Sequence, residues 1–175
     1  MSGENPESEQ QYEPIEIGLV VAGTLDEIDR KSLDVAVEST RRDLEQDFPE
    51  FKFLFRQVQR PELSEGSRVQ PSVLLQQATE DRDSRHWDFV LLVTGAELVG
   101  NYTPYCFAAL SRPLDGAVIS MSLVDPEAMG AEIDTVQRVQ RIAQRVATLF
   151  RHSLGHLLGL PQDDRSQNIL FHPST

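Results

Sequence analysis

Residues 152–162 read HSLGHLLGLPQ, and this stretch decides how the whole chain is interpreted. Two histidines, His152 and His156, are four residues apart. On a helix, side chains at that spacing lie on one face about 6 Å apart, so two imidazoles can share a single metal ion. Gly159 and Pro161 follow, and they are typical of a helix end because glycine adopts the left-handed conformation and proline cannot continue the helix. The stretch therefore predicts a helix that ends soon after two histidines on the same face.

The residue after the first histidine departs from a common metal-site motif. In HExxH sites a glutamate stands there and takes the proton from zinc-bound water. Here the residue is Ser153. Loss of a positioned general base typically costs about 10²- to 10⁴-fold in rate, and serine has no pKa near neutrality with which to replace it. The spacing thus predicts metal binding with severely impaired hydrolysis, and the alternative is a pair of polar residues on a helix flank that bind nothing.

The residues before the histidines predict one long amphipathic helix over about 130–158. At about 100° per residue the histidines lie on the flank of its apolar face, beside Arg145. The predicted apolar face consists of Val139, Ile142, Val146, Leu149, Phe150 and Leu157. A basic stripe along the same helix, which we interpret as a solvated face, consists of Arg138, Arg141, Arg145 and Arg151.

The rest of the chain predicts an α/β fold with a mixed, mostly parallel sheet and helices packed on it. Thr24 is expected to cap the first helix, with Glu27 completing a capping box. Apolar or alternating runs of residues predict strands over 15–22, 51–58, 87–94 and 116–123. A stripe of apolar residues at helical spacing predicts a helix over 24–48, and a proline at a helix start predicts another over 71–83. Irregular structure is expected over 59–69 and 95–113. Residues 1–13 are polar and acidic, which predicts a disordered tail before a single domain over 14–175.

Composition narrows the cellular context. The chain of 175 residues has one cysteine, Cys106, which excludes an intrachain disulfide and a cysteine-rich zinc module. No secretory signal and no apolar run long enough to cross a bilayer is found, so we expect a soluble cytoplasmic protein without a membrane partner. The net charge is −12, and residues 1–50 hold 14 of the 28 acids but only 4 of the 16 bases. An acidic protein of this kind argues against a nucleic-acid partner.

The motif around the histidines resembles that of the metzincin zinc proteases, HExxHxxGxxH, and among them the chain looks most like the archaemetzincins. His152, His156 and Gly159 match at the right intervals. Residues 168–173, NILFHP, resemble the stretch with the family's Met-turn, with Leu170 at the methionine. The resemblance implies a metzincin-like (zincin) domain whose cleft is bordered by an edge strand near residues 105–112.

Three departures fall on positions that are functional in that family. Ser153 stands at the general base, Gln162 at the third metal ligand and Leu170 at the turn methionine. A glutamine amide is a poor zinc ligand, so we expect zinc to be bound weakly or to be absent. Asp163 or Asp164 can supply a carboxylate in its place, although a solvated loop is the simpler interpretation of that pair. His172 offers a further imidazole, for which a packing role in the tail is the alternative.

Three functions follow from these observations. The first is a pseudo-peptidase that binds a peptide or protein in an extended cleft without cutting it. The second is an active zinc metallopeptidase with a non-standard site, in which His152, His156 and Asp163 or Asp164 hold the metal. The third is a non-enzymatic interaction protein whose acidic tail contacts a basic partner.

Overall fold

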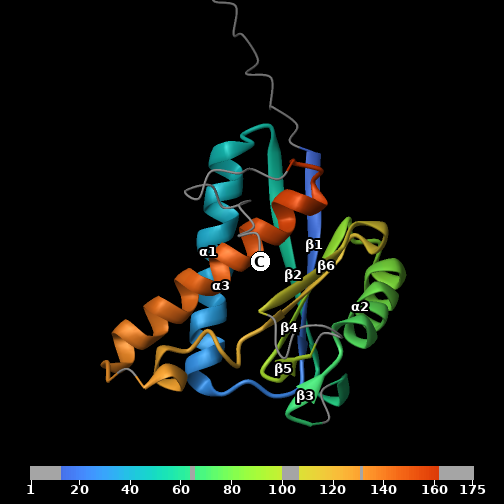
Figure 1. Cartoon of the computed structure of the whole chain (residues 1–175). Helices are drawn as coiled ribbons and strands as arrows, with labels where there is room; N and C mark the ends of the chain where they lie inside the picture. The colour runs from blue at the N-terminus through green and yellow to red at the C-terminus, as the bar shows by residue number, and fades with distance from the viewer. Residues whose placement is uncertain (1–12, 64–65, 100–106, 131, 162–175) are drawn as a thin grey trace, which may run out of the picture.

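A five-stranded sheet forms the centre of the molecule in the computed structural model, which describes residues 13–63, 66–99, 107–130 and 132–161. The strand order is β2-β1-β4-β7-β6 (Figure 1). β1 pairs in parallel with β2 and β4, β4 pairs in parallel with β7, and β6 pairs antiparallel with β7. This confirms the mixed, mostly parallel sheet. Its strands are β1 (Glu13–Ala22), β2 (Phe51–Arg60), β4 (Phe89–Thr94), β6 (Ala108–Ser111) and β7 (Gly116–Ser120).

The helices cover both faces of this sheet, which makes three layers (Figure 1). α1 (Glu27–Asp47) and α3 (Thr135–Leu157) pack on one face, where they share a core cluster with β1, β4 and β7. α2 (Pro71–Arg85) packs on the other face in a smaller cluster. Every residue of β7 is buried, as expected for a strand with a core on both sides.

Two helix starts differ from the sequence prediction. α1 is capped by Asp26, whose Oδ1 accepts from the backbone N–H of Asp29 at 2.8 Å, so Thr24 lies before the helix. α3 begins at Thr135 because Asp134 accepts from the backbone N–H groups of Val136 and Gln137. In both cases an aspartate next to the first turn satisfies backbone donors that would otherwise have no partner.

Short elements replace several segments that were expected to be irregular. β3 (Arg68–Val69) pairs with β5 (Glu97–Leu98) in a separate two-stranded sheet. Three single turns of 3₁₀ helix lie between the main elements, namely η1 (Pro61–Leu63), η2 (Arg112–Leu114) and η3 (Pro126–Met129). β2 extends past the predicted end at residue 58, β7 ends before residue 123, and residue 13 belongs to β1. The remainder of the predicted acidic tail, residues 1–12, lies outside the described residues.

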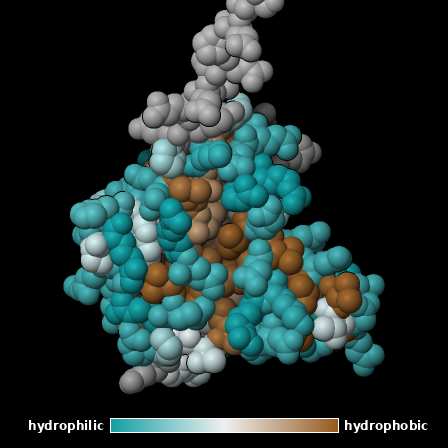
Figure 2. Space-filling view, turned by 180° about the vertical axis from the view of Figure 1, so that it is seen from behind, coloured by the Kyte–Doolittle hydropathy of each residue, from teal (hydrophilic) through white to brown (hydrophobic). Residues whose placement is uncertain are grey.

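Seen from behind, the surface is largely hydrophilic at its sides and has a band of hydrophobic residues near its centre (Figure 2). A single helix of 15 residues packs on the α2 side of the sheet, so this side is covered less completely than the side that carries α1 and α3. Within the described segments, no helix combines the length and the apolar character that a membrane span requires.

Candidate functional site

The last two turns of α3 bring the two histidines together. The ring centroids of His152 and His156 are 4.6 Å apart, and the ring planes meet at 78°. His156 is buried, with 7% of its surface exposed, and His152 is half-buried. This separation results from the i, i+4 spacing on a helix and leaves the two imidazoles close enough to bind one ion.

Ser153 lies on a different face of α3 from the histidines. It continues the buried stripe of Val146, Phe150 and Leu157, which packs against the sheet. The side chain is 0% exposed, and its Oγ has no hydrogen-bond partner in the described part of the chain. A residue in this environment is desolvated, so this position gives a hydroxyl no route to a proton acceptor in solvent.

The helix ends where the sequence predicts. Gly159 adopts a left-handed conformation with φ of 83°, and its N–H donates to the carbonyl of His156 at 3.1 Å. The N–H of Leu160 donates to the carbonyl of Gly155 at 3.0 Å. These bonds satisfy terminal carbonyl groups and reverse the chain direction. Five candidate residues after this turn lie outside the described residues: Gln162, Asp163, Asp164, Leu170 and His172.

The described residues do not complete a metal site. A catalytic zinc ion takes three protein ligands. Among residues 13–63, 66–99, 107–130 and 132–161, no group of three or more His, Cys, Asp or Glu side chains is arranged to hold a metal ion. His152 and His156 fit a single ion as a pair, which is one ligand short of a catalytic set.

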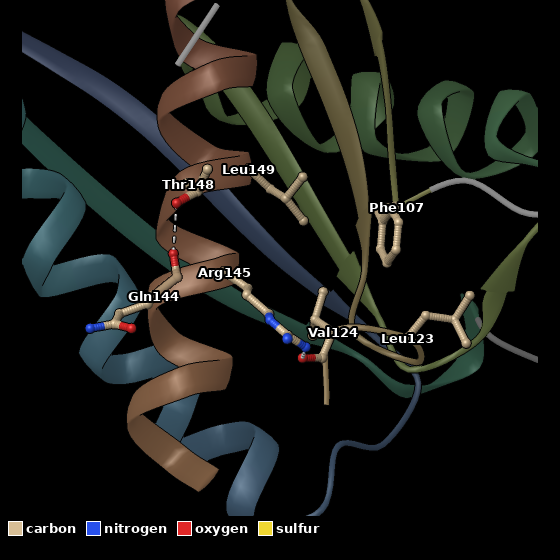
Figure 3. Close-up of a pocket in the computed structure, with 7 residues that line it drawn as sticks. All are labelled: Phe107, Leu123, Val124, Gln144, Arg145, Thr148 and Leu149. Carbon is tan, nitrogen blue, oxygen red and sulfur yellow. Dashed lines mark hydrogen bonds between the residues drawn. The ribbon is translucent and has the colours of Figure 1, made fainter. Parts of the chain in front are cut away.

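A groove of about 430 Å³ lies on the histidine side of α3, beside the middle of the helix (Figure 3). Leu149, one turn before His152, contributes to its wall, so the groove begins next to the histidine pair. The volume falls in the range of about 300–1,000 Å³ that is typical of ligand pockets. The groove is lined by Phe107, Leu123, Val124, Gln144, Arg145, Thr148 and Leu149.

The edge of the sheet, which no other described strand covers, lies next to this groove. Phe107 lines the groove and is followed directly by β6, the last strand in the sheet order. The N–H of Ser120 donates to the carbonyl of Phe107, so in an antiparallel ladder the backbone groups of Ala108 and Leu110 point away from β7. No described strand pairs with that outer side. An edge strand was expected here, near residues 105–112; β6 occupies 108–111, and residues 105 and 106 lie outside the described segments.

The basic stripe on α3 is not the uniform solvated face that the sequence suggested. Arg138 is partly buried and pairs with Asp125 at 2.5 Å and with Glu127 at 2.8 Å. Arg151 pairs with Asp43 on α1. These two arginines connect α3 to other elements, whereas Arg145 lines the groove and donates from Nη1 to the carbonyl oxygen of Val124 at 2.7 Å. Sequence spacing did not identify this role, because the partner carbonyl follows β7 and is 21 residues away.

Acidic groups near the N-terminal half of α3 have shifted pKa values. Burial raises the pKa of Asp125, but the hydrogen bonds and positive charge of Arg138 outweigh burial and hold the pKa below its usual value. Asp29 has a pKa raised to about 6, first by burial and then by the negative charges of Asp26 and Asp125. The carboxylate of Asp125 thus forms an ion pair with Arg138. Asp29, by contrast, is protonated in mildly acidic solution.

Comparison of structures identifies the fold. An archaemetzincin from Methanopyrus kandleri superposes with a TM-score of 0.66 at 18% identity, over 92% of this chain and 82% of that one. A zinc-dependent peptidase from Methanocorpusculum labreanum gives 0.62 at 16% identity, over 90% and 88%. An archaemetzincin from Archaeoglobus fulgidus, complexed with malonate, gives 0.58 at 15% identity, over 90% and 85%. No protein-family model matches the sequence, and no curated protein matches it. The architecture that holds the histidine helix in this chain is therefore an archaemetzincin-like fold.

Proposed function

We propose that this protein binds peptides or proteins in an extended conformation along β6 and does not hydrolyse them. The observation that carries the proposal is the free edge of β6 beside the groove on α3. The outward backbone groups of Ala108 and Leu110 can pair with an added strand, while a ligand side chain enters the groove. Main-chain hydrogen bonds supply affinity in this mode, and the groove supplies selectivity.

The environment of Ser153 supports the absence of hydrolysis. The position at which HExxH enzymes carry their base is fully buried here and holds a hydroxyl. A loss of about 10²- to 10⁴-fold from this cause alone would leave little turnover. The protein is thus a pseudo-peptidase on an archaemetzincin-like fold.

Zinc is not required for this function. His152 and His156 would hold the ion weakly, with Asp163 or Asp164 as the third ligand and Gln162 as a poorer one. One of the proteins with a similar structure is a zinc-dependent peptidase, so zinc is the metal to test first. We place the protein in the cytoplasm, without a membrane or nucleic-acid partner, in keeping with its charge of −12 and its single cysteine.

The central experiment separates binding from cleavage. Fluorescein-labelled nonapeptides are titrated against the purified protein by fluorescence polarisation, and each mixture is then incubated with and without zinc and examined by mass spectrometry. We expect saturable binding and intact peptides. Cleavage that is abolished both by a chelator and by His156→Ala would overturn the proposal in favour of an active metallopeptidase. An absence of binding by any peptide would favour an interaction protein that acts through its acidic tail.

A second experiment tests the binding mode. N-methylation of alternate peptide bonds in a bound peptide removes the hydrogen bonds to one side of its strand, so one methylation register should abolish binding and the other should preserve it. On the protein, Ala108→Pro removes an outward N–H and should weaken binding, since proline is tolerated on an exposed strand edge. Ala108→Val is the matched control, because it adds a side chain of similar size and keeps the N–H. Equal affinity of both variants would contradict strand addition.

A further inference from the structure

The groove contains one cationic side chain, and its setting differs from that of most arginines in the described chain. Arg60, for example, pairs with Asp81 at 2.6 Å, and Arg138 pairs with Asp125 at 2.5 Å. Arg145 forms no ion pair with the described residues, although the protein carries an excess of carboxylates. Its one hydrogen bond to those residues goes to a neutral carbonyl, that of Val124.

The nearby carboxylate of Asp125 is already engaged. Both of its oxygens accept from Arg138, and Oδ1 also accepts from the backbone N–H of Glu127. The positive charge of Arg145 reaches Asp125 and contributes to its lowered pKa, but the two side chains make no direct contact. Arg145 therefore keeps hydrogen-bonding capacity for a ligand, since a guanidinium has five N–H donors and the described residues engage one of them.

Arg145 is exposed, and one hydrogen bond orients its side chain toward the groove. The side chain leaves α3 and reaches the segment after β7, where the bond to Val124 holds it at the groove (Figure 3). Leu123, Val124 and Leu149 lie around it, and Phe107, 47% exposed, stands on the β6 side. Because this hydrogen bond already restricts the guanidinium, ligand binding costs it less conformational freedom than it would cost an arginine without such a bond.

We propose that Arg145 makes this groove selective for acidic peptides, which place an apolar side chain against the groove wall and a carboxylate against the guanidinium. The inference rests on the peptide binding proposed above and names its ligand class. Local charge complementarity carries it: Arg145 lines the groove, hydrogen-bonds a neutral carbonyl and makes no ion pair with the described residues. The net charge of −12 repels acidic ligands, so a preference for them has to arise at this cation. At about 0.15 M salt the Debye length is about 8 Å, which screens the remote charges more than a direct contact.

The test uses paired peptides and matched variants. The peptides are nonamers with a leucine at the centre, and each member of the series has one glutamate at a different position beside that leucine. Each glutamate peptide is compared with a second peptide that has glutamine at the same position. Affinities are measured by fluorescence polarisation at 0.15 M salt. We expect at least one glutamate peptide to bind about fivefold more tightly than its glutamine partner, the size of a single partly exposed ion pair.

Arg145→Gln should reduce the ratio of the two affinities to about one, because it replaces the cation of the groove lining by a neutral amide. Arg141→Gln is the control: it makes the same charge change one turn away, at an exposed residue outside the groove lining. Phe107→Ala should weaken both peptides equally. If both Arg141→Gln and Arg145→Gln abolish the preference for glutamate peptides to the same extent, the inference is wrong. The preference would then arise from the overall positive electrostatic potential of α3 and not from a contact with Arg145.

The two proposals fail in different ways. If glutamate and glutamine peptides bind equally, peptide binding stands and the selectivity of Arg145 is wrong. If no peptide of either kind binds, both proposals are wrong.

Discussion

The indole of Trp87 lies directly against the backbone of Gly18 in the middle of β1. A Cβ built on Gly18 would fall 1.8 Å from Cε3 of Trp87, far inside any real contact. Trp87 is buried, with 7% of its surface exposed, and belongs to the core cluster between the sheet and α2. The absence of a side chain at residue 18 therefore sets how closely this part of the core can pack on the sheet.

Gly18→Ala should destabilise the protein by about 3 kcal/mol, because the added methyl group meets the tryptophan ring and a well-packed core cannot absorb it. Gly95→Ala is the matched control, since the nearest atom to its Cβ would be 3.7 Å away, an ordinary contact. Urea unfolding followed by tryptophan fluorescence measures both variants. A Gly18→Ala protein as stable as Gly95→Ala would show that Trp87 does not occupy this position.

Asp29→Asn should change how stability depends on pH. The pKa of Asp29 is raised to about 6 in the folded protein, so the folded state binds a proton more tightly than the unfolded state does. This group therefore contributes stability below about pH 4 that is lost as the pH rises through about 6. Because the carboxyl is only half-buried, solvent screening reduces the effect to about 1 kcal/mol.

The measurement for Asp29 compares the free energy of unfolding of both proteins at pH 4.5 and pH 7.5. The variant should gain about 1 kcal/mol on the wild type between these two values. Comparing the two pH values cancels any constant effect of the substitution on the first turn of α1. Parallel curves for the two proteins would contradict the raised pKa.

Ser153→Glu should destabilise the protein by about 2 kcal/mol or more, because it places a carboxyl group in a fully buried position where the described residues offer the present hydroxyl no partner. Ser153→Ala should be neutral or slightly stabilising, since it removes a buried hydroxyl that has no partner in the described residues. Thermal and urea unfolding of the pair give the answer. A Ser153→Glu protein as stable as wild type would mean that this position opens to a cleft, and the argument against hydrolysis would lose its main support.

Zinc should bind weakly and through the histidines. We expect a Kd of about 1 μM or weaker by titration calorimetry, corresponding to about 8 kcal/mol, because two imidazoles and a poor third ligand fall short of a structural site at about 10–16 kcal/mol. His156→Ala should abolish the signal, and His86→Ala, at an exposed histidine after α2, should leave it unchanged. Nanomolar binding would indicate a complete ligand set.

Several features of the fold were predictable because they depend on local rules. The apolar runs around Leu92 and Val118 indicated strands, and the stripe through Val146 and Phe150 indicated the long helix. The starts of α1 and α3 were misplaced by a few residues, because several capping residues compete near each start and tertiary packing chooses among them. β3 and β5 have two residues each and so carry no periodic signal.

The sequence by itself determined that His152 and His156 share a helix face and that Gly159 ends the helix, since both follow from interactions within five residues. Tertiary structure decided the rest of the site. Ser153 is buried because α3 turns that face toward the sheet, and Arg145 borders a groove because the segment after β7 passes beside it. Helical spacing fixes which side chains share a face, and only the packing of distant elements fixes what each face meets.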